Sequence, residues 1–504
     1  MTSAARALQA AGEGRLELQA MVAALSRRYT VVSGPKLLVG RVQLDTFDRR
    51  LRAVGLTLEH QRLATGELLV LRRPGAASAV AVPVTGLRWP ALVEVLPTGP
   101  IREAVAPVTG VRALMVTSDE KRRMRRLELH NEDGKIVARV ELDEPASAAG
   151  APAQVTVRSL RGYDEDARRA DRLLVGLGLQ ALDRPEDREP SSAPPTSGPS
   201  RAVPARLVLT KALIDFLMTI RENLPGLLDD VDTEFLHDFR VAVRRTRATL
   251  KLGRPALPDA MRLEWEPAFR WLGDLTTPVR DLDVYELDLP VMSQWLVTAD
   301  PADLEPLATH LRGRRTSERR VLVRSLRSAR FRRLIMEWGE ELARLVDGSS
   351  DADREPLLAG HLADRSIARA YRRVARGGAL IGADSPAEDL HELRKRCKEL
   401  RYALEVFTPL IDDAARKRAV DDLKELQDVL GRFQDSEVQR RALREFAEEM
   451  MADGTTAGAM LAMGELIGHL DVEQNRARRE FDVAFARLVR PSARHLMHQI
   501  GGAT

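Results

Sequence analysis

Hydrophobic residues change their spacing near the middle of the chain. Before residue 183, short runs rich in Val and Leu alternate with turn residues, as in TGELLVLRRPG (65–75) and PAQVTVRSLRG (152–162). Short apolar runs bounded by turn residues are typical of β-strands. From residue 205 onward, apolar residues recur every three or four positions, which is typical of amphipathic α-helices. The pattern therefore predicts a β-rich region followed by an all-α region.

Three local features make the first region more specific. Asn131-Glu132-Asp133-Gly134 separates residues 125–130 from residues 135–142 and predicts a β-hairpin turn. The alternating segment at 154–159 predicts a strand, and residues 164–177 predict a helix after it.

One segment separates the two regions. Residues 183–204 contain six prolines together with Ser, Gly and charged residues, and show no apolar periodicity. This composition indicates an exposed tether between domains. We therefore predict a first domain over 1–182, a linker over 183–204 and a helical domain over 205–504. With 504 residues, 44% of them hydrophobic, the chain is long and apolar enough to bury two cores.

Composition limits the partners and the compartment. The net charge is only +4, and residues 201–504 hold 49 basic and 50 acidic residues. Any anionic ligand must therefore be recognised by local charge patterning. The lone cysteine, Cys397, excludes an internal disulfide framework and a Cys-cluster metal site. It fits a reducing compartment. Since no apolar run approaches the roughly 18–20 residues that span a bilayer, we expect a cytoplasmic protein without a membrane partner.

The helical region contains an internal repeat. The segment HDFRVAVRRTR, which begins at His237, recurs as HELRKRCKELR from His391, an offset of 154 positions. The same offset relates Asp274 to Asp428, and FRRL at 331–334 to FARL at 485–488. Shared landmarks at one offset predict a duplication, with two similar helical halves related by a pseudo-twofold axis.

Both copies of the motif carry a stripe of basic residues. Spacings of three and four positions place these residues on one face of a helix. The stripes are His237, Arg240, Arg244, Arg247 and Lys251 in the first copy and His391, Arg394, Lys398 and Arg401 in the second, with Arg245 and Lys395 beside them. Because like charges at these spacings repel, either acids on neighbouring helices or a bound polyanion must offset them. If the stripes face each other across the axis, they form one basic groove.

Two more segments add basic residues. Residues 312–333 hold ten arginines against a single acid, Glu318. A second helical stretch, 365–376, is also rich in arginine. From these segments we take Arg320, Arg324, Arg369 and Arg373 as further candidates for anion binding, although a solvated helix surface explains them equally well. Arginine suits phosphate because its planar fork donates two parallel hydrogen bonds and stays charged.

The quoted helices resemble the CHAD domain, which is named for a conserved histidine in an α-helical domain. LGDLTTPVRDLDV (272–284) and LQDVLGRFQDSEV (426–438) resemble the elements that follow each signature helix, and the likeness covers about residues 205–500. The resemblance implies two pseudo-symmetric four-helix bundles. It also implies binding of inorganic polyphosphate, without a cofactor, through the basic residues of both stripes, and association with polyphosphate granules.

The first region is similar to a CYTH domain of the triphosphate-tunnel type, through the segment DTFDRRLRAVGLTL (45–58). Catalytic CYTH enzymes open with an ExExK strand and hold divalent metal with further carboxylates. No ExExK precedes Asp45, and the strand at 154–159 carries no acid. Because hard cations need several oxygen ligands, we expect a degenerate CYTH-like domain without metal or triphosphatase activity. The expected fold class is thus α+β in two domains.

These observations predict a non-enzymatic protein that binds polyphosphate. One alternative is a metal-dependent triphosphatase of the CYTH type, and another is a generic binder of nucleic acid or other polyanions. An aromatic content of 4% offers few platforms for base stacking, and no nucleic-acid-binding motif is present, which argues against nucleic acid. The sequence specifies neither an oligomeric state nor a preferred polyphosphate length.

Overall fold

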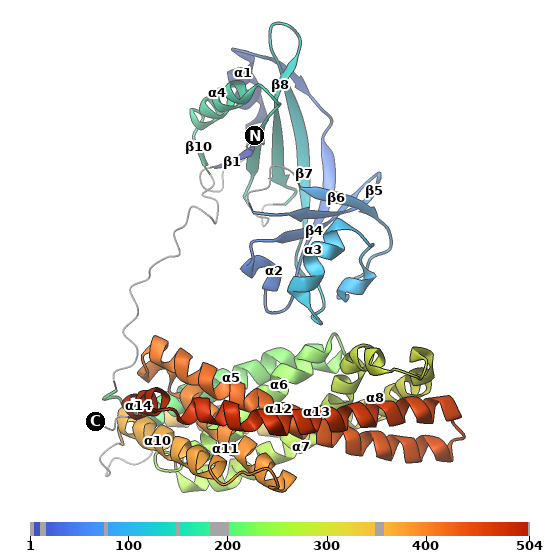
Figure 1. Ribbon diagram of the computed structural model, residues 1–504. Helices are drawn as coiled ribbons and strands as arrows, with labels where there is room; N and C mark the ends of the chain where they lie inside the picture. The colour runs from blue at the N-terminus through green and yellow to red at the C-terminus, as the bar shows by residue number, and fades with distance from the viewer. Residues whose placement is uncertain are drawn as a thin grey trace. The chain divides into compact units, whose positions relative to one another are not determined.

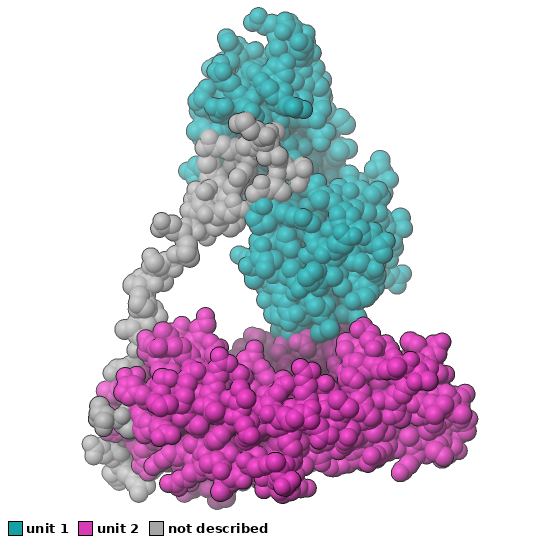
Figure 2. Space-filling view, viewed as in Figure 1, with its two compact units in different colours: residues 1–193 teal, residues 194–504 magenta. Residues whose placement is uncertain are grey.

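The computed structural model describes residues 5–10, 17–74, 79–147, 152–181, 201–347 and 357–501. The chain divides into two compact units, residues 1–193 (unit 1) and 194–504 (unit 2), coloured separately in Figure 2. Most of the predicted linker, 183–204, lies outside the described residues. Unit 1 is built on a sheet and unit 2 on helices, so the predicted fold class, a β-rich part followed by an all-α part, is confirmed. No helix in the described part of the chain is both long and apolar enough to cross a membrane.

An antiparallel sheet forms the centre of unit 1 (Figure 1). Its strand order is β10-β1-β9-β8-β7-β3-β4-β5-β6, and β2 pairs with β7. The strands are β1 (Ala5–Ala10), β2 (Thr30–Ser33), β3 (Leu37–Asp45), β4 (Thr57–Leu63), β5 (Gly66–Arg72), β6 (Val80–Val84), β7 (Met115–His130), β8 (Ile136–Pro145), β9 (Gln154–Ser159) and β10 (Leu179–Ala181). The predicted hairpin turn joins β7 to β8, and the strand predicted at 154–159 is β9, so both are confirmed.

Four short α-helices lie in the described part of unit 1. They are α1 (Leu18–Ser26), α2 (Arg50–Ala53), α3 (Pro100–Thr109) and α4 (Asp164–Val175), the last of which ends two residues before its predicted end. Alternate side chains of β9 are buried, as expected for a strand with one face on a core. One apolar cluster includes Leu25, Val155 and Leu174 and joins α1 and α4 to the sheet. A second cluster, with Leu58 and Ile101, joins α3 to β4.

Ten α-helices form the described part of unit 2. They are α5 (Ala205–Leu228), α6 (Thr233–Leu252), α7 (Asp259–Met292), α8 (Glu305–Leu326), α9 (Ala329–Asp347), α10 (Ala359–Gly378), α11 (Ala387–Val406), α12 (Asp413–Ala452), α13 (Ala457–Val489) and α14 (Pro491–Ile500). The helices α10, α11 and α12 begin 154 positions after α5, α6 and α7, respectively. Helix boundaries therefore follow the same offset as the sequence repeat.

The two repeats of unit 2 differ at their fourth helix but share a core. In the first repeat, α8 and α9 are separate, whereas the equivalent residues of the second repeat are continuous in α13 up to Val489. Tyr285 of α7 stacks edge-on against Phe446 of α12, with ring centroids 5.5 Å apart. Leu282, Leu443 and the two aromatic rings belong to one buried cluster. Because this cluster takes residues from both repeats, they pack as a single body.

Candidate functional site

The two helices that carry the predicted stripes, α6 and α11, pack against each other where the repeats meet. Two ion pairs connect them. Lys251 Nζ lies 2.6 Å from Glu399 Oε1, and Arg245 Nη2 lies 3.0 Å from Glu405 Oε2. An offset of 154 relates Lys251 to Glu405 and Arg245 to Glu399. Each ion pair is therefore the image of the other, as a pseudo-twofold axis between the two helices requires.

The same ion pairs fix the relative direction of α6 and α11. Along α6, Arg245 comes before Lys251. Their partners on α11 come in the reverse order, because Arg245 pairs with Glu405 and Lys251 pairs with Glu399. The helices therefore run in opposite directions where they cross. The charge of Arg244 acts on the amine of its repeat equivalent Lys398, so these two cations lie within electrostatic range of each other.

From the crossing, the basic residues extend in two opposite directions. Arg240 and His237 continue along α6 one way, while Arg394 and His391 continue along α11 the other way. The two ion pairs centre the crossing on residues 248 and 402, so His237 and His391 each lie eleven residues from it, roughly 30 Å apart along the helices at about 1.5 Å per residue. The stripes thus follow one another end to end instead of lying side by side. We call the set His237, Arg240, Arg244, Lys398, Arg394 and His391 the basic line.

Arg240 is anchored to the neighbouring helix α7. Its Nη1 donates to the carbonyl oxygen of Gly273 at 3.2 Å and to the hydroxyl oxygens of Thr276 and Thr277, both at 2.9 Å. Burial lowers the pKa of Arg240 to about 10, while the nearby carboxylate of Asp281 acts in the opposite direction. The guanidinium therefore stays charged at neutral pH and is fixed in position.

Arg394 repeats this arrangement on α12. Its Nη1 donates to the carbonyl oxygen of Gly431 and to Oδ1 of Asp435, each at 3.0 Å. Gly431 and Asp435 are the repeat equivalents of Thr277 and Asp281. Both copies thus use the same arginine to hold the motif helix against the next helix.

The two histidines also meet equivalent positions. His391 Nδ1 lies 2.8 Å from Gln434 Oε1 on α12. His237 lies near Arg280 of α7, the repeat equivalent of Gln434. Burial, and next the charge of Arg280, lower the pKa of His237 below its ordinary value, so this imidazole is neutral at pH 7 and does not add to the charge.

Arg244 and Lys398 are the exposed members of the basic line. Within the described ranges, neither lies at ion-pair distance from a carboxylate. Neighbouring atoms displace water from the amine of Lys398 even though much of the side chain remains exposed. This desolvation, followed by the charges of Arg394 and Arg244, lowers the pKa of Lys398 to about 8. Two exposed cations, one from each repeat, thus lie within electrostatic range of each other.

Most of the other predicted stripe residues are paired with glutamates. Besides the two ion pairs that cross between the helices, Arg401 Nε lies 2.9 Å from Glu405 Oε1, and Lys395 Nζ lies 2.6 Å from Glu392 Oε1. The side chain of Arg247 lies over Gly273 of α7, with Nη1 3.1 Å from the position that a Cβ would take there. These residues border the basic line.

The further candidates divide into two kinds. Arg320, Arg324 and Arg369 are exposed and have no carboxylate at ion-pair distance in the part of the chain that the structure describes. Arg373 Nη1 lies 2.6 Å from Glu399 Oε2. In the described part of the chain, neither Arg320 nor Arg324 of α8 forms a hydrogen bond or an ion pair with a residue of the basic line.

Two residues of the site were not predicted from the sequence. Each of these two glutamates binds two cations. Glu399 binds Lys251 and Arg373. Glu405 binds Arg245 and Arg401. The only signal in the sequence is that both acids lie inside the second motif, HELRKRCKELRYALE. Their partners across the axis depend on how the helices cross.

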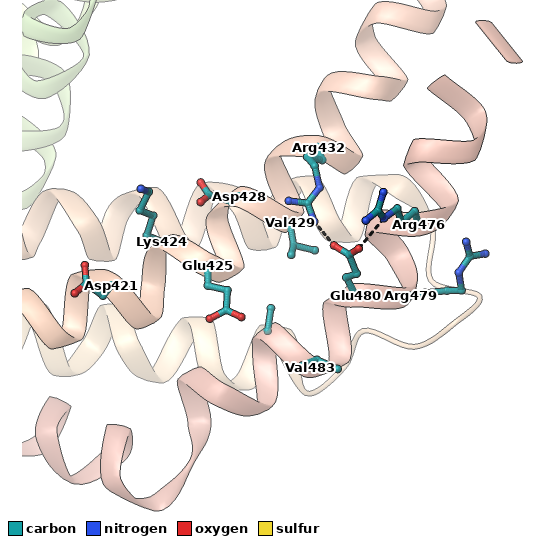
Figure 3. A pocket seen from close by; sticks show the side chains of 11 residues that line it. Asp421, Lys424, Glu425, Asp428, Val429, Arg432, Arg476, Arg479, Glu480 and Val483 are labelled. Carbon is teal, nitrogen blue, oxygen red and sulfur yellow. Dashed lines mark hydrogen bonds and ion pairs between the residues drawn. The ribbon is translucent and has the colours of Figure 1, made fainter. Parts of the chain in front are cut away.

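A pocket of about 730 Å³ lies between α12 and α13. Figure 3 shows Arg432 and Arg476 directed toward Glu480, and both form ion pairs with it. The lining holds four acids, Asp421, Glu425, Asp428 and Glu480, against four bases, Lys424, Arg432, Arg476 and Arg479. Because acids balance its cations, this pocket suits a polyanion less well than the basic line.

Unit 1 has its own cluster of charged side chains on the sheet. Arg41 Nη1 and Arg122 Nε each lie 2.7 Å from a carboxylate oxygen of Asp143, and Arg41 Nε lies 3.5 Å from Glu59. Gln61 also donates a hydrogen bond to Glu59, at 2.6 Å. The carboxylates are thus already occupied by cationic or amide donors. In the described ranges, no three His, Cys, Asp or Glu side chains are arranged to hold a metal ion. These residues do not fit the divalent metal site of a CYTH enzyme.

Comparisons with known proteins identify the helical part. Residues 211–444 match the family model of the CHAD domain. The chain is similar to the solved CHAD domain from the plant Ricinus communis, with 24% identity and a TM-score of 0.48, covering 57% of this chain and 92% of that chain. It is similar to PptA from Streptomyces chartreusis, with 19% identity and a TM-score of 0.44, covering 56% of this chain and 99% of that chain.

A third solved structure is a putative adenylyl cyclase from Hippeastrum that is described as having a dominant triphosphatase activity. It shares 15% identity at a TM-score of 0.26, covering 36% of this chain and 92% of that chain. No curated protein matches this chain.

The anchoring of Arg240 predicts a difference between two neighbouring arginines. Arg240→Ala should lower the free energy of unfolding of unit 2 by about 1–3 kcal/mol, because three acceptors on α7 lose a charged donor. Arg244→Ala, at an exposed position, should change it by less than about 0.5 kcal/mol. Urea denaturation of the full chain, followed by far-ultraviolet circular dichroism, measures both. Equal stabilities for the two variants would contradict the anchoring role.

Proposed function

Because unit 2 contains a CHAD domain, we propose that this chain binds inorganic polyphosphate along the basic line and does not hydrolyse it. The observation that carries the proposal is the pair Arg244 and Lys398. These equivalent cations, one from each repeat, lie within electrostatic range of each other, exposed and without a carboxylate at ion-pair distance among the described residues. Their mutual repulsion is relieved when an anion lies between them. The basic line suits a linear anion with closely spaced charges.

The anchored arginines add fixed donors on both sides of this pair. The contacts of Arg240 and Arg394 with α7 and α12 run through Nη1 in the described part of the chain. The other guanidinium nitrogens can therefore donate to phosphate oxygens while the side chain keeps its position. Holding donors in place before the ligand arrives reduces the entropy lost on binding. Such binding would bring the protein to polyphosphate granules.

We expect the full-length chain to bind long-chain polyphosphate with an affinity that falls as salt rises, because binding releases counterions. Arg244→Glu combined with Lys398→Glu should weaken binding by at least about tenfold, since repulsion replaces attraction at the axis. The matched control is Arg344→Glu combined with Arg441→Glu. Like the axis variant, this control replaces two basic residues by glutamate, so the change in charge is closely similar. Both arginines are exposed and pair with glutamates on their own helices. Fluorescence titration at two salt concentrations measures the affinities.

Two results would contradict this assignment. One is an unchanged affinity in the folded axis variant, and the other is an equal loss in the control variant. An RNA of matched charge, added as a competitor, separates polyphosphate binding from general polyanion binding. If RNA displaces bound polyphosphate as readily as unlabelled polyphosphate does, the result would favour the nucleic-acid alternative.

The charged cluster of unit 1 supports the second part of the proposal. Glu59 and Asp143 are engaged by Arg41 and Arg122, so metal binding would require these ion pairs to break. The full-length chain, incubated with tripolyphosphate and Mg²⁺ or Mn²⁺, should release no more phosphate than a sample without protein. Metal-dependent release that Asp143→Asn abolishes would instead establish a triphosphatase.

The lowered pKa of Lys398 predicts a pH dependence. An amine with a pKa of about 8 is largely charged at pH 7 and largely neutral at pH 9. The wild-type affinity for polyphosphate should therefore fall several-fold as the pH rises from about 7 to about 9. Lys398→Arg keeps its charge over this range, so the affinity of this variant should change less than about twofold. Identical pH profiles for the two proteins would show that Lys398 does not contact the ligand.

A further inference from the structure

The outer face of α10 carries four arginines that lack acidic partners. Arg365, Arg369, Arg372 and Arg376 are spaced by four, three and four positions, which places them on one face of the helix. All four are exposed, and none has a carboxylate at ion-pair distance among the residues that the structure describes. We call this set the α10 stripe. At about 1.5 Å per residue, it is roughly 16 Å long.

The first repeat has no equivalent of the α10 stripe. The positions 154 residues earlier, on α5, are Lys211, Asp215, Met218 and Glu222. Lys211, Asp215 and Glu222 are exposed charged residues of mixed sign, and Met218 is 45% exposed. The pseudo-symmetry seen at α6 and α11 therefore does not extend to the outer helices. The α10 stripe has no counterpart on α5, so a ligand that follows this stripe leaves the axis on one side only.

Arg373 connects the α10 stripe to the basic line. Arg373 Nη1 and Lys251 Nζ bind the two oxygens of Glu399, each at 2.6 Å. One carboxylate therefore separates a cation of α10 from a cation of α6. Lys398, the central member of the basic line, precedes Glu399 on α11. On the opposite side of the axis, the residue equivalent to Arg373 is the uncharged Thr219.

We propose that the α10 stripe is a second binding surface for polyphosphate, used by chains too long to be held by the basic line alone. This inference rests on the proposed function. A short oligophosphate contacts only the basic line, whereas a long chain also crosses Arg373 and follows the stripe. Affinity therefore rises with chain length. The ligand leaves the axis over α10 and not over α5, because α5 carries Asp215 and Glu222 on the equivalent face.

The test uses the full-length chain with Arg365, Arg369, Arg372 and Arg376 all changed to Gln. Its affinity for tripolyphosphate, measured at about 0.15 M salt, where exposed charges more than roughly 8 Å apart are largely screened, should stay within about twofold of the wild type. Its affinity for long-chain polyphosphate should fall by at least about tenfold. The slope of log affinity against log salt should decrease by about 2–3, since up to four fewer counterions are released.

The matched control changes four other exposed arginines to Gln. Because four arginines become glutamine in both variants, the net charge changes by the same amount. Each control arginine pairs with a glutamate on its own helix; they are Arg312, Arg333, Arg344 and Arg441. Both affinities of the control should stay within about twofold of the wild type. An equal loss of long-chain affinity in the control would mean that only net charge matters, which overturns the proposal.

A gain-of-function variant tests the asymmetry. Asp215→Arg, Met218→Arg and Glu222→Arg, together with the existing Lys211, build an equivalent stripe on α5. This variant should bind long-chain polyphosphate several-fold more tightly than the wild type and tripolyphosphate equally well. A wild-type chain that binds no polyphosphate overturns both the proposed function and this inference. A wild-type chain that binds, with unchanged long-chain affinity in the four-glutamine variant, overturns this inference alone.

Discussion

The repulsion between Arg244 and Lys398 is the constraint around which the helical unit is organised. A twofold axis brings each residue near it against its own equivalent, so a basic motif that is duplicated must place cation against cation. Two glutamates relieve this problem on the flanks, since Glu399 and Glu405 bridge the repeats and hold the cations beside the axis. No such acid meets the central pair within the described ranges. The axis is therefore the place where an external anion gains most.

The arginines next to the axis combine two tasks in one side chain. Arg240 and Arg394 pack the motif helices against α7 and α12 through hydrogen bonds to backbone, hydroxyl or carboxylate oxygens. Their positions follow from folding, so the donors are in place before a ligand arrives. This dual use explains why the motif positions are basic in both repeats although Arg240 and Arg394 are largely enclosed. It also implies that removing these two side chains mixes effects on stability with effects on binding, which makes Arg244 and Lys398 the cleaner probes.

Local periodicity was enough to predict the helical unit, the hairpin at Asn131–Gly134 and the strand β9, because each depends on residues close in sequence. The repeat offset also predicted which residues are equivalent. The end-to-end basic line could not be predicted in this way, because it depends on the direction in which α6 and α11 cross. The same holds for Glu399 and Glu405, whose partners lie about 150 positions away on the other repeat. Strand β1 has the sequence ARALQA, whose alanines do not distinguish a strand from a helix.

Residues 201–504 contain almost equal numbers of acids and bases, yet their charges are not evenly mixed. Glu480 of α13 and Glu399 and Glu405 of α11 each form ion pairs with two basic side chains. Each such pair removes a site at which a polyanion could bind and adds little to stability when it is exposed. Among the exposed cations without a carboxylate at ion-pair distance in the described ranges are Arg244, Lys398 and the four arginines of the α10 stripe. A helical unit with almost no net charge can thus present a narrow basic path, and the divergence of the second repeat from the first gives that path a direction.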